Sequence, residues 1–222
     1  MVVTIAQLFD LSHTLAAPYL AALTYPWEAL PHLEAWLIDL GQALPRDEYE
    51  QREKNVWFHK TAHIAPTAAI GGLCIVGAET EVRHGAYIRK NALIGRGCVV
   101  GNSVEIKNAI LFDGVQVPHY NYVGDSILGY RAHMGAGAIA SNVKADRTPV
   151  VVHDGKMCYA TGLQKLGAML GDYAEIGCNS VLNPGSVIGR HSTVYPLSSV
   201  RGCVDEDSIY KKDGWIVKKS IS

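Results

Sequence analysis

The sequence contains few bulky aromatic side chains and few charges. Only 8% of the 222 residues are aromatic, with Phe at 3, and 18% are charged, for a formal net charge of -1 at pH 7. A nearly neutral chain of this kind is not expected to bind nucleic acids or membrane surfaces in general. Gly, in contrast, numbers 22, so the composition favours many turns over a large aromatic core.

A secretory signal is not expected at the amino terminus. The first Lys or Arg is Arg46, so the basic flank of a secretory signal is absent. The least charged stretch, from Leu11 to Trp27, contains Pro18 and Pro26 and is too short and too broken to span a bilayer.

The cysteines are odd in number and form no CxxC pair. This pattern argues against a disulfide framework or a zinc site and indicates reduced thiols. The sequence therefore predicts a cytoplasmic protein without a metal. The five cysteines are Cys74, Cys98, Cys158, Cys178 and Cys203.

Branched aliphatic residues recur at every sixth position over much of the chain. From Ile64 onward eight successive positions of this series are Ile or Val, and mostly small side chains follow four residues after each. The series then resumes twice. Its members are Ile64, Ile70, Val76, Val82, Ile88, Ile94, Val100 and Ile106, then Leu128 and Met134, then Leu170, Ile176, Leu182, Ile188, Val194 and Val200.

A period of six fits neither a helix nor a plainly alternating strand, but it fits a short strand followed by a tight turn. Hexapeptide repeats of this kind predict a parallel β-helix, in which each strand stacks on its equivalent one coil later. The pattern resembles the left-handed β-helix of the hexapeptide-repeat acyltransferase superfamily, which has three hexads per triangular coil. We therefore expect an all-β fold with a left-handed β-helix over residues 61–204 and a loop inserted at 143–165.

The two ends of the chain lack the repeat. Residues 1–60 are predicted to be a helical cap over the first coil followed by a polar connector. An apolar stripe indicates the main helix, which Gly41 is expected to close. In the tail, residues 205–222, two short β-prone runs flank Asp213-Gly214 and predict a hairpin. The stripe comprises Leu30, Leu33, Trp36, Leu37 and Leu40.

The series of six first breaks after Ile106, close to the ring-rich segment PHYNYVGDS. The strings VEIKNA, HYNYVGDSILG and MGAGAIASN closely resemble the acetyltransferase half of the bifunctional glucosamine-1-phosphate N-acetyltransferase and N-acetylglucosamine-1-phosphate uridyltransferase enzymes. Strings after the loop, LGAMLGDYAEIG and PGSVIG, are similar to related archaeal sugar-nucleotide enzymes. The resemblance implies acetyl transfer from acetyl-coenzyme A to an amino sugar, its phosphate or its nucleotide. It also implies a homotrimer with sites between neighbouring prisms.

The chemistry of acetyl transfer gives His119 a role. An amine that attacks a thioester must lose a proton, and the ordinary pKa of histidine lies near working pH. The resemblance assigns the histidine of this motif as that base. Backbone N–H groups or Asn142 are candidates to stabilise the oxyanion that forms on the thioester carbonyl.

Arg89 and Lys107 are candidate phosphate ligands. They are eighteen residues apart, a full coil of three hexads, so we expect them to stack on one face. They coincide with the phosphate-binding Arg and Lys of the family, where Arg offers a planar fork and Lys a point charge. The resemblance further assigns a sugar contact to Tyr122 and coenzyme A contacts to Ala136 and Cys178.

The sequence departs from the family at two places. His133 replaces an Asn fourteen residues beyond the catalytic histidine, and we expect it either to serve as a polar substrate contact or to be a surface residue. The family's loop lysine has no clear counterpart, with Lys144, Arg147 and Lys156 as loose candidates. Asp125 is expected either to orient the histidine or to shape a turn. No glycine-rich nucleotide-binding segment precedes the repeats, so uridylyl transfer is not expected of this chain.

Two other functions remain open on this scaffold. A non-catalytic binding or scaffold protein is favoured by the missing lysine and opposed by the intact HYNYVGD. A metalloenzyme resembling the γ-class carbonic anhydrases needs three convergent histidines, typically with two of them five residues apart, and no such pair occurs here. The acceptor amine, and the choice between acetyl and a longer acyl donor, also stay open.

Overall fold

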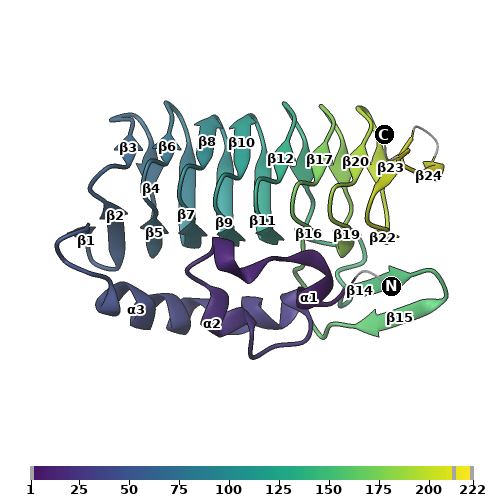
Figure 1. Cartoon of the computed structure of the whole chain (residues 1–222), viewed down its shortest axis with the longest axis horizontal. Coiled ribbons are helices and arrows are strands. Elements are labelled where there is room, and N and C mark those ends of the chain that lie inside the picture. Colours follow the sequence, from purple (N-terminus) through teal and green to yellow (C-terminus); the bar gives the residue numbers. More distant parts are fainter. Residues whose placement is uncertain (1–2, 212–213, 221–222) are drawn as a thin grey trace.

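The structure is a computed structural model that describes residues 3–211 and 214–220. A parallel β-helix forms its main body, and short strands stack coil upon coil along three faces (Figure 1). The predicted β-helix is confirmed.

Face 1 is a single sheet of short strands. Its members, in spatial order from the amino-terminal end, are β3 (His63–Ile64), β6 (Glu81–Val82), β8 (Val99–Asn102), β10 (Gln116–His119), β12 (His133–Met134), β17 (Glu175–Ile176), β20 (Thr193–Val194) and β23 (Ser208–Tyr210). All of these pair in parallel.

Faces 2 and 3 belong to one continuous sheet, because three long strands run around the corner between them. These strands are β7 (Tyr87–Ile94), β9 (Glu105–Leu111) and β11 (Tyr122–Leu128). Face 2 is completed by β4 (Ala69–Ile70), β13 (Ile139–Ala140), β18 (Val181–Leu182) and β21 (Ser199–Val200). Face 3 is completed by β2 (Val56–His59), β5 (Cys74–Val76), β16 (Ala168–Leu170), β19 (Ser186–Ile188) and β22 (Cys203–Val204).

The residues at sixfold spacing form the core of the prism. Ile88, Ile94 and Val100 are each fully buried, as the repeat predicts. Burying such a branched side chain contributes about 1.5–3 kcal/mol, and the gain recurs in every coil.

The break in the series after Ile106 is a shortened corner. Ile94 lies beside Leu111, and Leu111 lies beside Leu128, so these two coils contain seventeen residues each rather than eighteen. The corner residues Asn108 and Asp125 have φ values of 49° and 50°. Asn and Asp tolerate this left-handed conformation better than most residues, which allows the tight turn.

The amino-terminal helices lie along face 3 rather than over the first coil alone (Figure 1). Helix α3 contacts β5 and β7, and the 3₁₀ helix η2 contacts β11. The face 3 side chains Ile75, Leu93 and Ile110 are consequently at most 1% exposed. The segment comprises α1 (Ile5–Leu8), η1 (Leu11–His13), α2 (Ala17–Leu20), η2 (Pro26–His32) and α3 (Leu33–Ala43).

Gly41 lies inside α3 and does not end it, contrary to the prediction. A Cβ at this position would collide with the indole ring of Trp57. The glycine therefore permits close packing between α3 and β2.

Both ends of the β-helix are covered by antiparallel strands. Strand β1 (Tyr49–Glu53) pairs with β2 within the predicted connector, and β24 (Ile216–Lys218) pairs with β23 in the predicted carboxy-terminal hairpin. Such pairing satisfies backbone groups that would otherwise lie at an open edge. Asp213 of the predicted turn lies outside the described residues.

We predict that Ile94→Asp unfolds the β-helix. Ile94 is fully buried between Val76 and Leu111, so the carboxylate would lack a partner and cost several kcal/mol. Urea denaturation followed by far-UV circular dichroism measures the change. Gln116→Ala, at an exposed position, is the matched control and should unfold at nearly the wild-type midpoint.

Candidate functional site

Lys107 is held by a buried carboxylate at the corner between faces 2 and 3. Its Nζ lies 3.2 Å from Oδ2 of Asp125, and the side chain of Asp125 is 6% exposed. The same carboxylate accepts hydrogen bonds from the side-chain amides of Asn108 at 2.8 Å and Asn142 at 2.5 Å. Asp125 therefore orders three polar residues that surround it.

Tyr122 joins this cluster from face 2. Its hydroxyl accepts a hydrogen bond from Nδ2 of Asn142 at 3.1 Å. Burial raises the pKa of Tyr122, and the negative charge of Asp125 raises it further. The phenol thus stays protonated at neutral pH and can donate a hydrogen bond.

Arg89 lies at the same corner one coil earlier, but not in register with Lys107. The strand pairing shifts between Ile88 and Lys90, and Lys90 rather than Arg89 pairs with Lys107. The expected eighteen-residue stack is therefore wrong in detail. Arg89 instead forms an exposed ion pair with Glu105 at 2.9 Å. The hydrogen bond to this carboxylate raises the pKa of the guanidinium, which remains charged.

His119 lies at a different corner, between faces 1 and 2, and is exposed. Its backbone N–H donates to Oδ1 of Asn121 at 3.1 Å. The amide of Asn121, which is 2% exposed, donates in turn to the carbonyls of Gly135 and Ala138. Asn121 thus ties the backbone at His119 to the next coil.

The predicted coenzyme A contacts stack on His119 along that corner. The N–H of Gly137 donates to the carbonyl of His119 at 3.0 Å, and the N–H of Asn179 donates to the carbonyl of Ala136 at 2.8 Å. His119, Ala136 and Cys178 therefore occupy the same corner in three successive coils. Cys178 is exposed there.

Face 2 connects the two corners. The strand β11 starts near His119 with Tyr122 and reaches Asp125 at the other corner. The outward residues Glu105, Tyr122 and Ile139 lie side by side on successive strands of this face. The predicted acceptor residues and the predicted base thus flank one strip of surface.

Other predicted residues lie apart from this strip. His133 projects from face 1, and its Nδ1 lies 2.7 Å from Oε2 of Glu175. Lys144 contacts Thr148 and Asp146 within its own loop. Neither residue contacts Tyr122 or Asn142 in the described part of the chain, so the proposed contact of His133 with substrate has no geometric support.

The inserted loop leaves the coil directly after Asn142 and returns at Leu166, whose N–H donates to the carbonyl of Asn142 at 3.0 Å. The middle of the loop is an antiparallel hairpin of β14 (Val151–Asp154) and β15 (Met157–Ala160). This hairpin contacts β19 and β22. The loop therefore begins beside Asp125, but it does not extend over His119 within one chain.

Sequence reasoning did not assign Asn108 or Glu105 to the site, and it did not predict the contact of Asp125 with Lys107. Asp125 was expected either to orient His119 or to shape a turn, and it binds Lys107 while adopting the turn conformation. Asn91, Asn108 and Asp125 recur every seventeen residues, and this spacing could have predicted that they share a corner. A search for residues six apart does not detect it.

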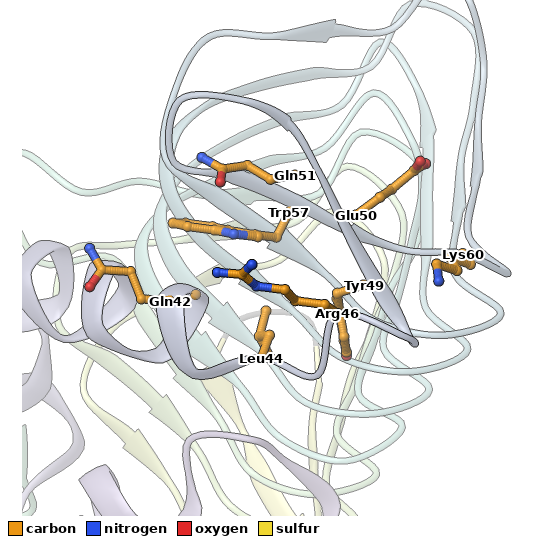
Figure 2. A pocket seen from close by; sticks show the side chains of 9 residues that line it. Gln42, Leu44, Arg46, Tyr49, Glu50, Gln51, Trp57 and Lys60 are labelled. Carbon is orange, nitrogen blue, oxygen red and sulfur yellow. The ribbon is translucent and has the colours of Figure 1, made fainter.

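The pocket drawn in Figure 2 lies elsewhere. It encloses about 780 Å³ between the end of α3 and the hairpin of β1 and β2, with Arg46, Tyr49 and Trp57 among its lining residues. None of the predicted site residues lines it. Within residues 3–211 and 214–220, no cluster of three or more His, Cys, Asp or Glu side chains is placed to hold a metal ion. No helix in that part of the chain is long and apolar enough to cross a membrane.

Comparisons with known proteins place the similarity in the β-helix. The GMPPB C-terminal domain family matches residues 70–160. The bifunctional protein GlmU of Methanococcus maripaludis is 35% identical over 136 residues, which is 60% of this chain and 33% of the relative. A bifunctional sugar-1-phosphate nucleotidylyltransferase/acetyltransferase of Sulfurisphaera tokodaii is 31% identical over 105 residues, which is 47% of this chain and 26% of the relative.

The chain thus spans about a third of the length of these curated relatives or less. Among solved structures, a mutant of perosamine N-acetyltransferase from Caulobacter crescentus, in complex with CoA and GDP-perosamine, is 16% identical with a TM-score of 0.35. That match covers 85% of this chain and 74% of the other. The sequence similarities confirm the resemblance to the acetyltransferase part of the bifunctional enzymes.

We predict that the Lys107–Asp125 pair is energetically coupled and that the Arg89–Glu105 pair is not. The first pair is largely buried, so removing either partner alone should cost about 1–3 kcal/mol. The second is exposed and screened by solvent. Double-mutant cycles to alanine, followed by urea denaturation at low and high salt, measure both couplings. Equal couplings for the two pairs would contradict the assignment of Asp125 as the buried anchor.

Proposed function

We propose that the protein is a coenzyme A-dependent N-acetyltransferase whose acceptor is an amino sugar, a sugar phosphate or a nucleotide sugar. The proposal rests on one observation above all: His119 shares a corner with Ala136 and Cys178, and face 2 joins that corner to the cluster around Asp125. The Sulfurisphaera tokodaii relative is named as both a sugar-1-phosphate nucleotidylyltransferase and an acetyltransferase, which supports this interpretation. A cytoplasmic location is part of the proposal.

In the proposed reaction the donor thioester lies along the corner of Ala136 and Cys178, with its carbonyl toward His119. The acceptor lies on face 2, where the Tyr122 hydroxyl contacts the sugar. His119 accepts the amine proton as the nitrogen attacks the thioester carbon, and the carbon–sulfur bond then breaks. The departing thiolate of coenzyme A takes the proton from His119, which leaves the N-acetylated acceptor and a free thiol. The exposed side chain of His119 is accessible to both substrates. Asn142 fixes Tyr122 and is not oriented toward the thioester, so backbone N–H groups remain the candidates for the oxyanion.

The charged groups around the proposed acceptor site indicate which of its residues can bind a phosphate. Arg89 and Lys107 each have a carboxylate partner, Glu105 and Asp125, so the four side chains together carry no net charge. Arg89 can exchange its exposed partner for a phosphate at little cost, since exposed ion pairs contribute little. Lys107 cannot do so without leaving Asp125 uncompensated. We therefore assign phosphate binding mainly to Arg89 and a fixed positioning role to Lys107.

A non-catalytic binding or scaffold protein is the second candidate. Two contacts favour it: Lys107 is already neutralised by Asp125, and His133 pairs with Glu175 on face 1. Turnover of acetyl-coenzyme A with a panel of amino sugars separates the two candidates.

We predict that His119→Ala lowers turnover about 10²- to 10⁴-fold and leaves the fold intact, because general-base catalysis contributes a factor of this size. Arg89→Ala should raise the KM for a phosphorylated acceptor with little change in kcat. Acetyl transfer is measured by release of the free thiol of coenzyme A. His63→Ala, at an exposed position of face 1, is the control and should retain wild-type rates. Undiminished turnover by a folded His119→Ala protein would end the assignment of the base.

We further propose that the protein is a homotrimer with a closed threefold axis. Face 2 and its corners expose apolar side chains, among them Tyr87 at 43%, Val181 at 38% and Leu197 at 73%. Sedimentation equilibrium at micromolar concentration should give three times the mass of the 24.0 kDa chain. A monomer mass would contradict this assembly.

A further inference from the structure

The hairpin of the inserted loop pairs a cysteine with a histidine. Cys158 on β15 lies directly opposite His153 on β14, and the register of the two strands determines this pairing. The sulfur of Cys158 lies 3.3 Å from Nδ1 of His153, and both residues are exposed. Directly opposed side chains on antiparallel strands stay within reach of each other, so the contact follows from the backbone rather than from one rotamer.

The other thiols differ from Cys158 in this respect. Burial raises the pKa of Cys74, Cys98 and Cys203 to about 12, which leaves these thiols protonated and unreactive. Cys178 is exposed, but no histidine contacts its sulfur in the part of the chain that is described. It therefore serves as an internal reference for an exposed thiol without a base.

A pocket of about 390 Å³ lies next to Cys158. Its walls include Tyr25, Trp27 and Leu163 together with Glu28, and Cys158 itself is a lining residue. The neighbouring Tyr159 ring lies 5.4 Å from the ring of Tyr25 and holds the hairpin against the amino-terminal segment. Cys158 is thus one of the residues that line a partly aromatic hollow.

We propose that Cys158 is a nucleophilic thiol that accepts an acyl group from a small thioester, with His153 as its base. His153 takes the thiol proton, and the sulfur of Cys158 attacks the thioester carbonyl carbon. The carbon–sulfur bond of the donor then breaks, and the departing thiolate takes the proton from His153. The products are an S-acyl Cys158 and a free thiol, and no oxidant or reductant is needed. The neighbouring pocket, which Cys158 helps to line, accommodates the carrier of the acyl group.

This site is separate from the acetyl-transfer site proposed above. The hairpin contacts β19 and β22 of face 3, whereas His119 lies at the corner of faces 1 and 2. The two proposals can therefore fail independently.

The test uses the full chain in two single-substitution forms, each of which leaves one exposed thiol. Cys178→Ser retains Cys158, and Cys158→Ser retains Cys178. Each protein is incubated with the acetyl thioester of N-acetylcysteamine, and acetylation is followed by intact mass and peptide mapping. Because a positioned base accelerates the step, we expect Cys158 to react at least about tenfold faster than Cys178.

Further variants are made in the Cys178→Ser protein. His153→Ala and His153→Asn should lower the rate to that of Cys178, whereas Met157→Ala, at an exposed neighbour, should leave it unchanged. His119→Ala should also leave it unchanged, which distinguishes this site from the acetyl-transfer site. Equal rates at Cys158 and Cys178, or a rate at Cys158 that both folded His153 variants retain, would overturn the proposal.

Discussion

The hydrogen-bonded register between successive coils constrains the rest of this structure. Each strand donates to the next coil at equivalent positions, so a residue's place in one coil determines which residues lie above and below it. Ile88 thus lies beside Ile106, and Ile106 beside Val123, and all three fill the prism. A change of one residue in coil length shifts the strand pairing of all the residues that follow it. The chain accommodates such a change only at corners whose residues tolerate a left-handed backbone.

The proposed acceptor region lies at the corner where the coils are one residue shorter than the regular repeat. Seventeen-residue coils bring Asn108 and Asp125 into one column, and the turn at Asp125 directs its carboxylate to Lys107. Gly167 of the next coil completes the column. Its N–H donates to the carbonyl of Asp125, and a side chain there would collide with the carbonyl of Gly124 and the hydroxyl of Ser126. The shortened corner therefore serves both packing and the polar cluster.

Much of the fold could be predicted because the repeat is a local pattern. One residue in six specifies an inward position, and the stack of identical positions follows without knowledge of distant contacts.

The placement of residues 1–60 could not be predicted in this way. Face 3 needs a cover because side chains such as Leu93 are apolar on the outward side, but the period of six counts only inward residues. The helices therefore looked like a cap for one end rather than a cover for a side. A motif was enough to name the candidates His119, Ala136 and Cys178, and the structure brings them to one corner, but their roles stay predictions. The partners of individual side chains could not be predicted from a motif. Lys107 was predicted as a phosphate ligand, and that role stays a prediction; its ion pair with Asp125 was not predicted, because the need of a buried carboxylate for compensation depends on the fold.

The three faces differ in how much exposed apolar surface they offer, and this difference affects which face can form an interface between subunits. Face 3 is occupied by the amino-terminal helices, so no second chain can pack on it. Face 1 presents polar pairs such as His133–Glu175, which would lose water on burial without gaining new partners. Face 2 alone combines exposed apolar side chains with the polar strip between His119 and Asp125. An isolated chain leaves that strip open on its outer side, with no loop over His119. If a second copy of the chain packs on one of the faces, the exposed apolar side chains favour face 2, which contains the candidate site. The second copy would then enclose the strip between His119 and Asp125 on the side that a single chain leaves open.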